Sequence, residues 1–200
     1  MDHSVRVAEI FAEHMENISA TAVGANEAIA EAGEVVVHAL LSDNKVVCAG
    51  SGSFHLVAQL FTSHLLNRFG RERPALPAIT LSSDSTLVNT ISEDTQFADA
   101  IARQVSALGN AGDVLLLAAG PGRGESLIRA LRAALDREMI VVLLHGQGQD
   151  PHQHDLLSLL TSRDVEVAIP VDSTPRLLES QLVLINVLGE LVDLYLFGGD

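Results

Sequence analysis

The sequence is poor in the residues that build disulfide frameworks, aromatic cores and basic binding faces. Cys48 is the only cysteine, which excludes an internal disulfide and fits a reducing compartment. Lys45 is the only lysine, and 12 Lys and Arg residues stand against 26 Asp and Glu residues, which gives a net charge of −14. Because phosphate backbones repel so acidic a chain, direct binding to DNA or RNA is not expected.

Long hydrophobic runs and targeting signals are also missing. The first residues lack a basic segment followed by an apolar stretch, so no signal peptide is predicted. No stretch reaches the roughly 20 apolar residues that span a bilayer. The longest, 182–197, is interrupted by Asn186, Glu190 and Asp193. We therefore expect a cytoplasmic protein that contacts no membrane.

What the sequence does contain is aliphatic. Its 200 residues are 48% hydrophobic but only 4% aromatic, so a single domain over 1–200 would build its core from Leu, Val, Ile and Ala. Apolar residues recur at helical spacing in 4–41, which predicts two helices. We expect residues 1–43 to serve oligomerisation and residues 44–200 to form the core.

That core is predicted from the alternation of short apolar runs with helical patterns. The apolar runs are 45–49, 78–81, 114–118, 140–144 and 165–169. The helical patterns lie near 54–69, 85–108, 123–138 and 152–161. This alternation predicts an α/β three-layer sandwich, in which a five-stranded parallel sheet lies between two layers of helices.

A last helix is predicted from Pro175 to Phe197, and its apolar residues cover nearly the whole circumference. A helix that is apolar all round must be buried all round. We therefore expect it to pack against its own sheet and against another subunit, in a closed symmetric assembly.

Two glycine-rich turns each follow a predicted strand and open a predicted helix. The first is Gly50-Ser51-Gly52-Ser53, and the second runs from Gly120 to Gly124. Such a turn directs free backbone N–H groups and the positive end of a helix dipole outward, which suits an anion. The second turn has no hydroxyl side chain before Ser126, so part of the chemistry that holds phosphate is missing.

Six segments, taken together, are specific enough to indicate a family: 66–69, 72–79, 104–109, 111–116, 164–167 and 194–197. In these segments the chain resembles the sugar isomerase (SIS) domain family, and within it the phosphoheptose isomerase group, in particular the branch that associates with the replication initiator DnaA. The resemblance covers nearly the whole chain. It implies a flavodoxin-like or Rossmann-like sheet of five parallel strands, and a homotetramer with pockets at subunit boundaries.

Isomerases of this family convert a ketose phosphate to an aldose phosphate, which needs phosphate-binding groups and a group that moves a proton. In the first turn, Phe54 replaces the family's last hydroxyl. In the next helix, Leu60 stands where the resemblance places a histidine, and His64 stands where it places the catalytic glutamate. The second turn, 119–124, has lost the hydroxyl at each of three serine positions.

The last helix departs from the family in the same direction. The family's Arg-Ile-Gln-Glu reads Arg176-Leu177-Leu178-Glu179, and Gln181 and Asn186 stand where two histidines are expected. Leucine cannot coordinate a cation, so we expect neither a metal nor a cofactor. The resemblance implies no catalytic residue here, since the family's positions are held by Leu60, His64, Leu178 and Asn186.

A cleft with this backbone could still bind an anion such as a sugar phosphate. The expected contacts are Ser51, Gly52, Ser53, Ser83, Asp94, Gly120, Gly122 and Arg123, of which Asp94 matches the family's pattern. Arg123 could replace the lost serines through a bidentate pair, or it could be a solvated arginine. His55, at the start of the same helix as His64, could also contact an anion.

Several histidines have two interpretations. His64 could be a substitute base, but a polar residue near a subunit boundary is favoured. His145, His152 and His154 could form a metal cluster. Residues two apart on a helix point to different faces, so a surface loop is favoured, with Pro151 beginning the next helix.

The leading hypothesis is a non-catalytic adaptor, a homotetramer that binds DnaA and promotes its assembly at the replication origin. Leu196 and Phe197 either bind this partner or finish an oligomer interface, and Cys48 is expected to be a buried thiol rather than a nucleophile. The acidic surface would suit a basic partner. The alternatives are a phosphoheptose isomerase acting on sedoheptulose 7-phosphate, and a sensor that binds a phosphosugar without converting it.

Overall fold

The sheet confirms the predicted α/β architecture. The computed structural model describes residues 3–122, 124–148 and 151–198. Its strands are β1 (Val46–Gly50), β2 (Ala78–Thr80), β3 (Val114–Ala118), β4 (Ile140–Gly146) and β5 (Val165–Ile169). They pair in the order β2-β1-β3-β4-β5, and every pairing is parallel.

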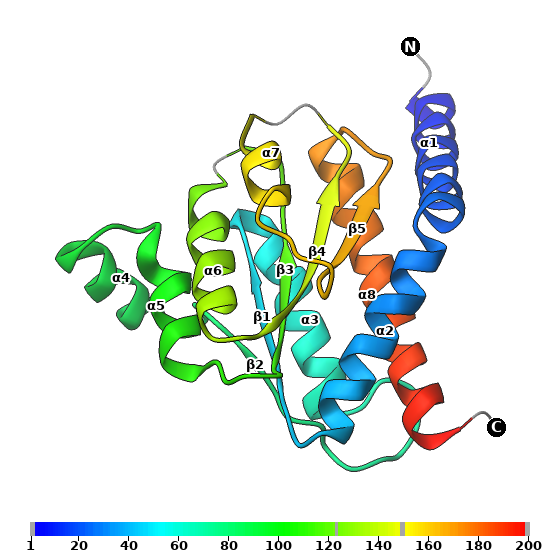
Figure 1. Ribbon diagram of the computed structural model, residues 1–200. Coiled ribbons are helices and arrows are strands. Elements are labelled where there is room, and N and C mark those ends of the chain that lie inside the picture. Colours follow the sequence, from blue (N-terminus) through cyan, green and yellow to red (C-terminus); the bar gives the residue numbers. More distant parts are fainter. Residues whose placement is uncertain (1–2, 123, 149–150, 199–200) are drawn as a thin grey trace.

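Helices cover both faces of this sheet, which makes three layers (Figure 1). The helices are α1 (His3–Gly24), α2 (Asn26–Leu41), α3 (His55–Leu66), α4 (Ser85–Asp94), α5 (Asp99–Leu108), α6 (Glu125–Asp136), α7 (Pro151–Leu157) and α8 (Thr174–Phe197). A short 3-10 turn, η1 (Gly52–Phe54), precedes α3. Apolar side chains of α2, α3 and α8 pack on one face, and those of α5, α6 and α7 pack on the other.

β1 and β3 form the centre of the sheet because their side chains are apolar on both faces. All residues of both strands are buried. Val46 and Cys48 face the layer of α2, α3 and α8, whereas Val47 and Ala49 face the layer of α5, α6 and α7. Continuous apolar runs are typical of parallel strands that are covered on both sides.

The helical pattern predicted near 85–108 is confirmed, but it forms two helices, α4 and α5, with a break between them. Asp84 caps α4 by accepting hydrogen bonds from two amides of its first turn. α4 ends where Thr95 leaves the helical region and returns both its amide and its hydroxyl to the Ile91 carbonyl. Threonine is a weak helix former, and here its hydroxyl helps to close the last turn.

α8 is covered on one side by its own chain and open on the other. Its inner side packs against α2 and α3 and includes three buried polar residues, Ser180, Gln181 and Asp193. The outer side carries four large side chains that are 39 to 45% exposed, namely Val183, Val187, Leu194 and Tyr195. The single chain therefore does not bury this helix all round, and its outer face is exposed.

The apolar character of α8 would also suffice, by length and composition, for a membrane span, and α8 is the only such helix in the described part of the chain. Core helices of soluble proteins meet the same criterion. The packing of α8 against α2 and α3 accounts for the apolar character of its inner side, and Asp193 in this helix is ion-paired with Arg73.

α1 is the least buried helix of the fold. Thr21 is its one buried residue. Val7, Phe11 and Met15, spaced four residues apart, are 51, 64 and 67% exposed and form an apolar stripe along the helix. In Figure 1, α1 reaches past the end of the sheet, on the side opposite the α4–α5 pair. This stripe is a second apolar surface that the chain leaves uncovered.

Candidate functional site

The two glycine-rich turns lie side by side at the carboxyl end of the sheet. Gly50 is paired with Ala118 across β1 and β3. The Ser51 amide donates to the Ala118 carbonyl at 3.1 Å, and the Ser51 hydroxyl accepts from the Gly120 amide at 3.1 Å. Ser51, predicted as a ligand contact, joins the two turns to each other.

The first turn keeps a backbone shape that suits an anion. Gly50 has no room for a side chain, since a Cβ there would lie 2.5 Å from the carbonyl oxygen of Phe54. Gly52 has a φ of 54°, in the region that favours glycine. η1 begins at Gly52, so the amides of Gly52 and Ser53 have no acceptor within it. Both residues are exposed beside the N-terminal end of α3, where the helix dipole favours negative charge.

Phe54 fills the space between the two turns with hydrocarbon. Its side chain is 3% exposed and belongs to the core under α2, α3 and α8. The ring lies directly on the second turn, because a Cβ on Gly120 would come within 2.2 Å of Phe54 Cε2. Where the resemblance expects a phosphate-binding hydroxyl, an aromatic ring therefore packs the turns together.

The changed positions on α3 and α8 extend this apolar contact. Leu60 and Leu178 are both partly buried against the same core cluster. Gln181 is fully buried, and its side-chain amide donates to the carbonyls of Ala119 at 2.9 Å and Leu144 at 3.4 Å. Leu60 and Leu178 cannot ligate a metal ion, because they offer only hydrocarbon. Gln181 Oε1 is buried and has no hydrogen-bond partner among the described residues.

His64 and Asn186 contact each other, although both differ from the family's residues. His64 Nε2 lies 3.0 Å from Asn186 Oδ1, so the ring nitrogen donates and Nδ1 is left as the acceptor. The ring also packs edge-on against Phe69, with centroids 4.9 Å apart. Burial lowers the pKa of His64, more than the Asn186 hydrogen bond raises it. The His64 ring is therefore a neutral imidazole, and the hydrogen bond to Asn186 fixes its orientation.

A buried ion pair fixes this part of α3 to α8. Arg73 donates through Nε to Asp193 Oδ1 at 2.6 Å, and the two side chains are 1 and 8% exposed. The same guanidinium donates to the carbonyls of His64 and Leu65, at the end of α3. Arg73 therefore satisfies terminal carbonyls of α3 and, through Asp193, holds the end of α3 that carries His64 against α8.

The single chain does not bring the His64–Asn186 pair to the glycine-rich turns. His55 begins α3 beside the first turn, and His64 follows nine residues later. Nine residues of helix correspond to about 14 Å along the axis. His55 is half-buried, and burial lowers its pKa. Its Nε2 is buried without a hydrogen-bond partner among the described residues.

Of the other predicted ligand contacts, only some lie near the turns. Ser83 is exposed just after β2, the neighbour of β1, and its hydroxyl lies 3.5 Å from the Thr80 carbonyl. Gly122 is exposed with a φ of 103°. Asp94 instead ends α4 and lines a groove between α4 and α5. Arg123 lies outside the described residues.

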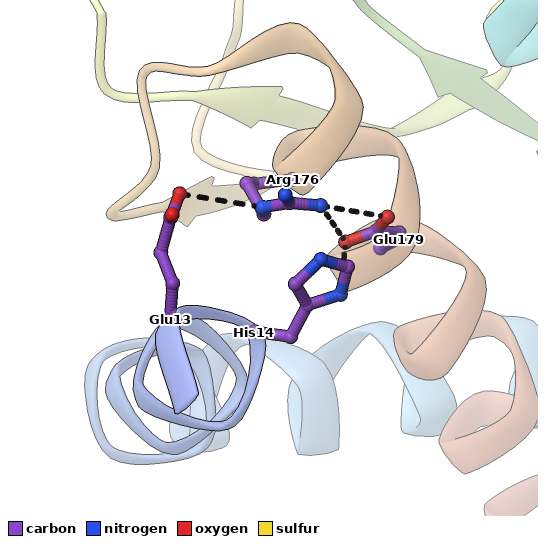
Figure 2. A network of polar contacts seen from close by, with 4 residues as sticks. All are labelled: Glu13, His14, Arg176 and Glu179. Atoms are coloured by element: carbon purple, nitrogen blue, oxygen red, sulfur yellow. Dashed lines mark hydrogen bonds and ion pairs between the residues drawn. The ribbon is translucent and has the colours of Figure 1, made fainter. Parts of the chain in front are cut away.

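Arg176 and Glu179, from the segment that matches the family's Arg-Ile-Gln-Glu, fasten α1 to α8 (Figure 2). Arg176 Nη1 donates to both carboxylate oxygens of Glu179 at 3.0 Å. Arg176 Nε reaches Glu13 at 3.3 Å, and His14 Nδ1 lies 2.9 Å from Glu179. This network gives the motif residues a structural role, namely holding α1 against the first turns of α8.

The expectation of a surface loop around the three clustered histidines is wrong for His145. His145 lies in β4 and is 4% exposed, because its ring is held by the Gly146 carbonyl and by Glu166 on β5, both at 2.9 Å. Pro151 does begin α7, as predicted. His154 lies exposed on that helix, and the backbone of His152 belongs to the same helix.

Cys48 is the buried thiol that was predicted. It is fully buried in β1. Burial raises its pKa to about 12, although a hydrogen bond with Thr62 opposes this. The thiol is therefore protonated at neutral pH and is no nucleophile.

The two residues predicted to bind a partner lie at the C-terminal end of α8. Leu196 and Phe197 are both half-buried in the last turn. Leu196 packs against the core cluster under α2, α3 and α8. Whether their exposed parts bind a partner or another subunit stays a prediction.

The groove between α4 and α5 was not foreseen. Its α4 wall is formed by Leu87, Thr90, Ile91 and Asp94. These residues are spaced i, i+3, i+4 and i+7, a pattern that places them on one helical face. The signal was therefore present in the sequence, but it indicates a groove only once the break at Thr95 is known.

Comparison with known proteins identifies the family. A model of the SIS domain matches residues 9–146. A phosphoheptose isomerase of Methylococcus capsulatus is 38% identical over 198 residues, which cover 99% of this chain and 100% of that protein. The DnaA initiator-associating protein DiaA of Salmonella paratyphi B is 37% identical over 192 residues, or 96% of each chain. A solved phosphoheptose isomerase structure from Francisella tularensis has a TM-score of 0.89 at 32% identity, and the match covers 96% of this chain and 99% of that one.

The chain therefore belongs to the SIS domain family, in the group that contains phosphoheptose isomerases and DiaA. A second phosphoheptose isomerase structure, from Neisseria gonorrhoeae, has a TM-score of 0.86 at 28% identity and covers 95% of this chain and 98% of that one. Relatives of both names align along nearly the full length, so their names alone do not separate an enzyme from an adaptor.

Proposed function

We propose that this chain is a non-catalytic SIS-domain adaptor of the cytoplasm, a homotetramer that binds the replication initiator DnaA and promotes its assembly at the origin. The observation that carries the proposal is the packing of Phe54 onto Gly120. With Leu60 and Leu178 against the same core, three positions that the resemblance assigns to phosphate or metal binding hold apolar side chains.

The proposed partner comes from the relatives and from charge. A relative named for its association with DnaA is 37% identical over nearly the whole chain. The net charge of −14 would speed encounter with a basic, DNA-binding protein at low salt.

Uncovered helix faces support the proposed tetramer. The apolar outer face of α8 and the apolar stripe of α1 would be buried between subunits. A tetramer would also hold several initiator molecules at high effective concentration.

A paired experiment tests the adaptor. The purified protein is assayed for conversion of sedoheptulose 7-phosphate, and immobilised protein is used to retain purified DnaA. We expect no turnover and clear retention. The variant Leu196→Ala/Phe197→Ala should lose retention, whereas Leu41→Ala on α2, where the leucine is 73% exposed, serves as the control. Turnover at an ordinary enzymatic rate without retention of DnaA would discard the adaptor.

Two further observations each favour one of the alternative functions, a phosphosugar sensor and an isomerase. The amides of Gly52 and Ser53 favour a phosphosugar sensor, which should show a higher melting temperature with sedoheptulose 7-phosphate but not with unphosphorylated sedoheptulose. The neutral His64 ring, oriented by Asn186, favours an isomerase with a substitute base. In that case His64→Gln should abolish turnover.

A further inference from the structure

The outer face of α8 is almost uncharged, although the chain as a whole is strongly acidic. From 183 to 197, a stretch that the structure describes in full, the exposed residues are Val183, Asn186, Val187, Glu190, Leu194 and Tyr195. Glu190 is the only charged residue among them. Because the net charge of the chain is −14, this is a face on which two copies can meet with little repulsion.

Asn186 is a polar group in the middle of this face. It is exposed between Val183 and Val187, which are 40 and 39% exposed. Residues three and four apart lie on the same side of a helix, so the amide and both valines face the same way. A second copy that covers the two valines therefore covers Asn186 as well.

The His64 ring extends this face from the end of α3. His64 Nε2 lies 3.0 Å from Asn186 Oδ1, and the ring packs edge-on against Phe69. Gly189 lets the ring approach α8 closely, since a Cβ at that position would lie 3.4 Å from His64 Cδ2. The imidazole is half-buried in the single chain. A copy that covers Asn186 would bury it further.

Only the neutral form of His64 is satisfied in this setting. Protonation would add an N–H at Nδ1, which has no hydrogen-bond partner among the described residues. Burial lowers the pKa of His64, the Asn186 hydrogen bond and the charge of Asp193 raise it, and the charge of Arg73 lowers it. Because Asp193 and Arg73 are ion-paired with each other, neither is a free counter-ion for an imidazolium.

We propose that the outer face of α8 binds a second copy of this chain and that the His64–Asn186 pair makes this contact pH-sensitive, so that protonation of His64 opens it. The proposal rests on the homotetramer of the proposed function and adds its regulation. An imidazolium covered by apolar side chains of the other copy would lose its hydration without gaining a counter-ion. The contact is therefore closed at neutral pH and weakened by acid.

The direction of the pH effect follows from burial. The separated chain takes up a proton at His64 more readily than the assembled chain, in which the ring is more buried. The contact therefore has its full strength above the ordinary histidine pKa of about 6.5 and weakens as the pH falls below that value. Acid also makes each chain less negative, which reduces repulsion between copies and acts in the opposite direction.

Glu190 gives the proposal a clear alternative. It lies one helical turn beyond Asn186 on the same face. If the Glu190 carboxylate of the second copy paired with His64, acid would strengthen the contact, because the imidazolium would then have a counter-ion. A contact that is stronger in acid would therefore overturn the proposal.

The test is sedimentation velocity of the full chain over a range of protein concentrations, at about pH 7.5 and about pH 5.5. We expect the concentration at which the wild-type assembly is half dissociated to rise about tenfold or more at the lower pH. His64→Gln keeps a neutral donor for Asn186, so its assembly should not weaken in acid. His38→Gln, on the exposed side of α2, is the matched control and should respond as the wild type does. Equal weakening of the wild type and His64→Gln would overturn the proposal.

Asn186→Asp tests the pair from its other side and serves if His64→Gln does not fold, as judged by circular dichroism. A carboxylate beside Nε2 would give the imidazolium a partner, so the assembly of this variant should be stronger at about pH 5.5 than at about pH 7.5. An Asn186→Asp assembly that weakens in acid as much as the wild type would contradict a role for the pair.

Retention of purified DnaA separates this proposal from the proposed function. If the wild type is monomeric at both pH values, the homotetramer and this proposal both fail. If it forms a tetramer that retains DnaA but does not weaken in acid, the adaptor stands and this proposal fails. If its assembly weakens in acid through His64 but retains no DnaA, the adaptor fails and this proposal stands.

Discussion

Two apolar hollows in the described part of the chain differ: the one between the glycine-rich turns is closed, and the groove between α4 and α5 is open. Between the glycine-rich turns, the Phe54 ring lies on Gly120, so hydrocarbon meets the chain's own backbone. Between α4 and α5, Leu87 and Leu108 face outward and stay about 40% exposed. An apolar side chain therefore occupies the expected phosphate position in the first hollow, and it forms an exposed surface in the second. The two hollows differ because Gly120 covers the Phe54 ring, whereas no described residue covers the outer parts of Leu87 and Leu108.

The largest expected effect is at the closed hollow. Phe54→Ala should lower the free energy of unfolding by about 3–5 kcal/mol, because it removes a buried ring and leaves a cavity. Leu87→Ala, in the open groove, is the matched control and should cost about 1 kcal/mol or less, since its side chain is already partly solvated. Urea unfolding followed by circular dichroism measures both. Similar losses for the two variants would erase the contrast between the hollows.

Gly120→Ala tests the same contact from its other side. A Cβ there would come within 2.2 Å of the Phe54 ring, so the variant should cost about 1–3 kcal/mol through overpacking. Combined with Phe54→Ala, the same alanine should cost less than it does alone, since the obstructing ring is gone. Strict additivity would show that the ring and the glycine do not touch.

A comparable loss is expected from the buried ion pair between the end of α3 and α8. Asp193→Ala leaves the Arg73 guanidinium buried and without its carboxylate, which should cost about 3–5 kcal/mol. The control is Glu72→Ala, which breaks an exposed pair with Arg68 and should cost less than about 1 kcal/mol. The measurement is again urea unfolding. Near-equal losses in the free energy of unfolding for the two variants would mean that the contact between α3 and α8 is accessible to water.

Much of the fold could be predicted because it depends on local patterns. The apolar run at 114–118 coincides with β3, since a parallel strand buried on both faces reads as an unbroken apolar segment. The run at 165–169 coincides with β5, although exposed Glu166 interrupts it. The lost hydroxyl at Phe54 was also visible, because it follows from residue type alone. Where that ring would go was not, since its contact with Gly120 joins segments far apart in the sequence.

The features that were missed depend on contacts across the fold. Gln181 was read as a lost histidine, but the structure gives its amide two backbone carbonyls to bridge. His145 was placed in a loop, because only the pairing of β4 with β5 brings Glu166 beside it. The break at Thr95 depends on a hydroxyl that returns to Ile91, which periodicity does not reveal.

A smaller effect is expected from pH. Burial lowers the pKa of His64 in the folded state, so the unfolded chain binds protons more readily at this residue. Its contribution is complete above the ordinary histidine pKa of about 6.5 and is lost as the pH falls below that value. The melting temperature should therefore fall between about pH 7 and pH 5, and His64→Gln should flatten the fall. His38→Gln, on the exposed side of α2, is the control. An unchanged slope in His64→Gln would assign the pH dependence to other groups.

The smallest expected signal comes from Cys48, and its absence is the informative result. The thiol lies in β1, two residues before the first glycine-rich turn, and is fully buried with a pKa of about 12. At about pH 8 its thiolate fraction is then roughly a thousandfold below that of an ordinary thiol. A disulfide reagent should label the native protein only as fast as the chain opens, and should label it fully in denaturant. In Phe54→Ala the native rate should rise, because the ring that packs the turns beside β1 is gone. Rapid labelling of the wild type would mean that the closed hollow opens readily. The two hollows would then differ only in how often they are exposed to solvent.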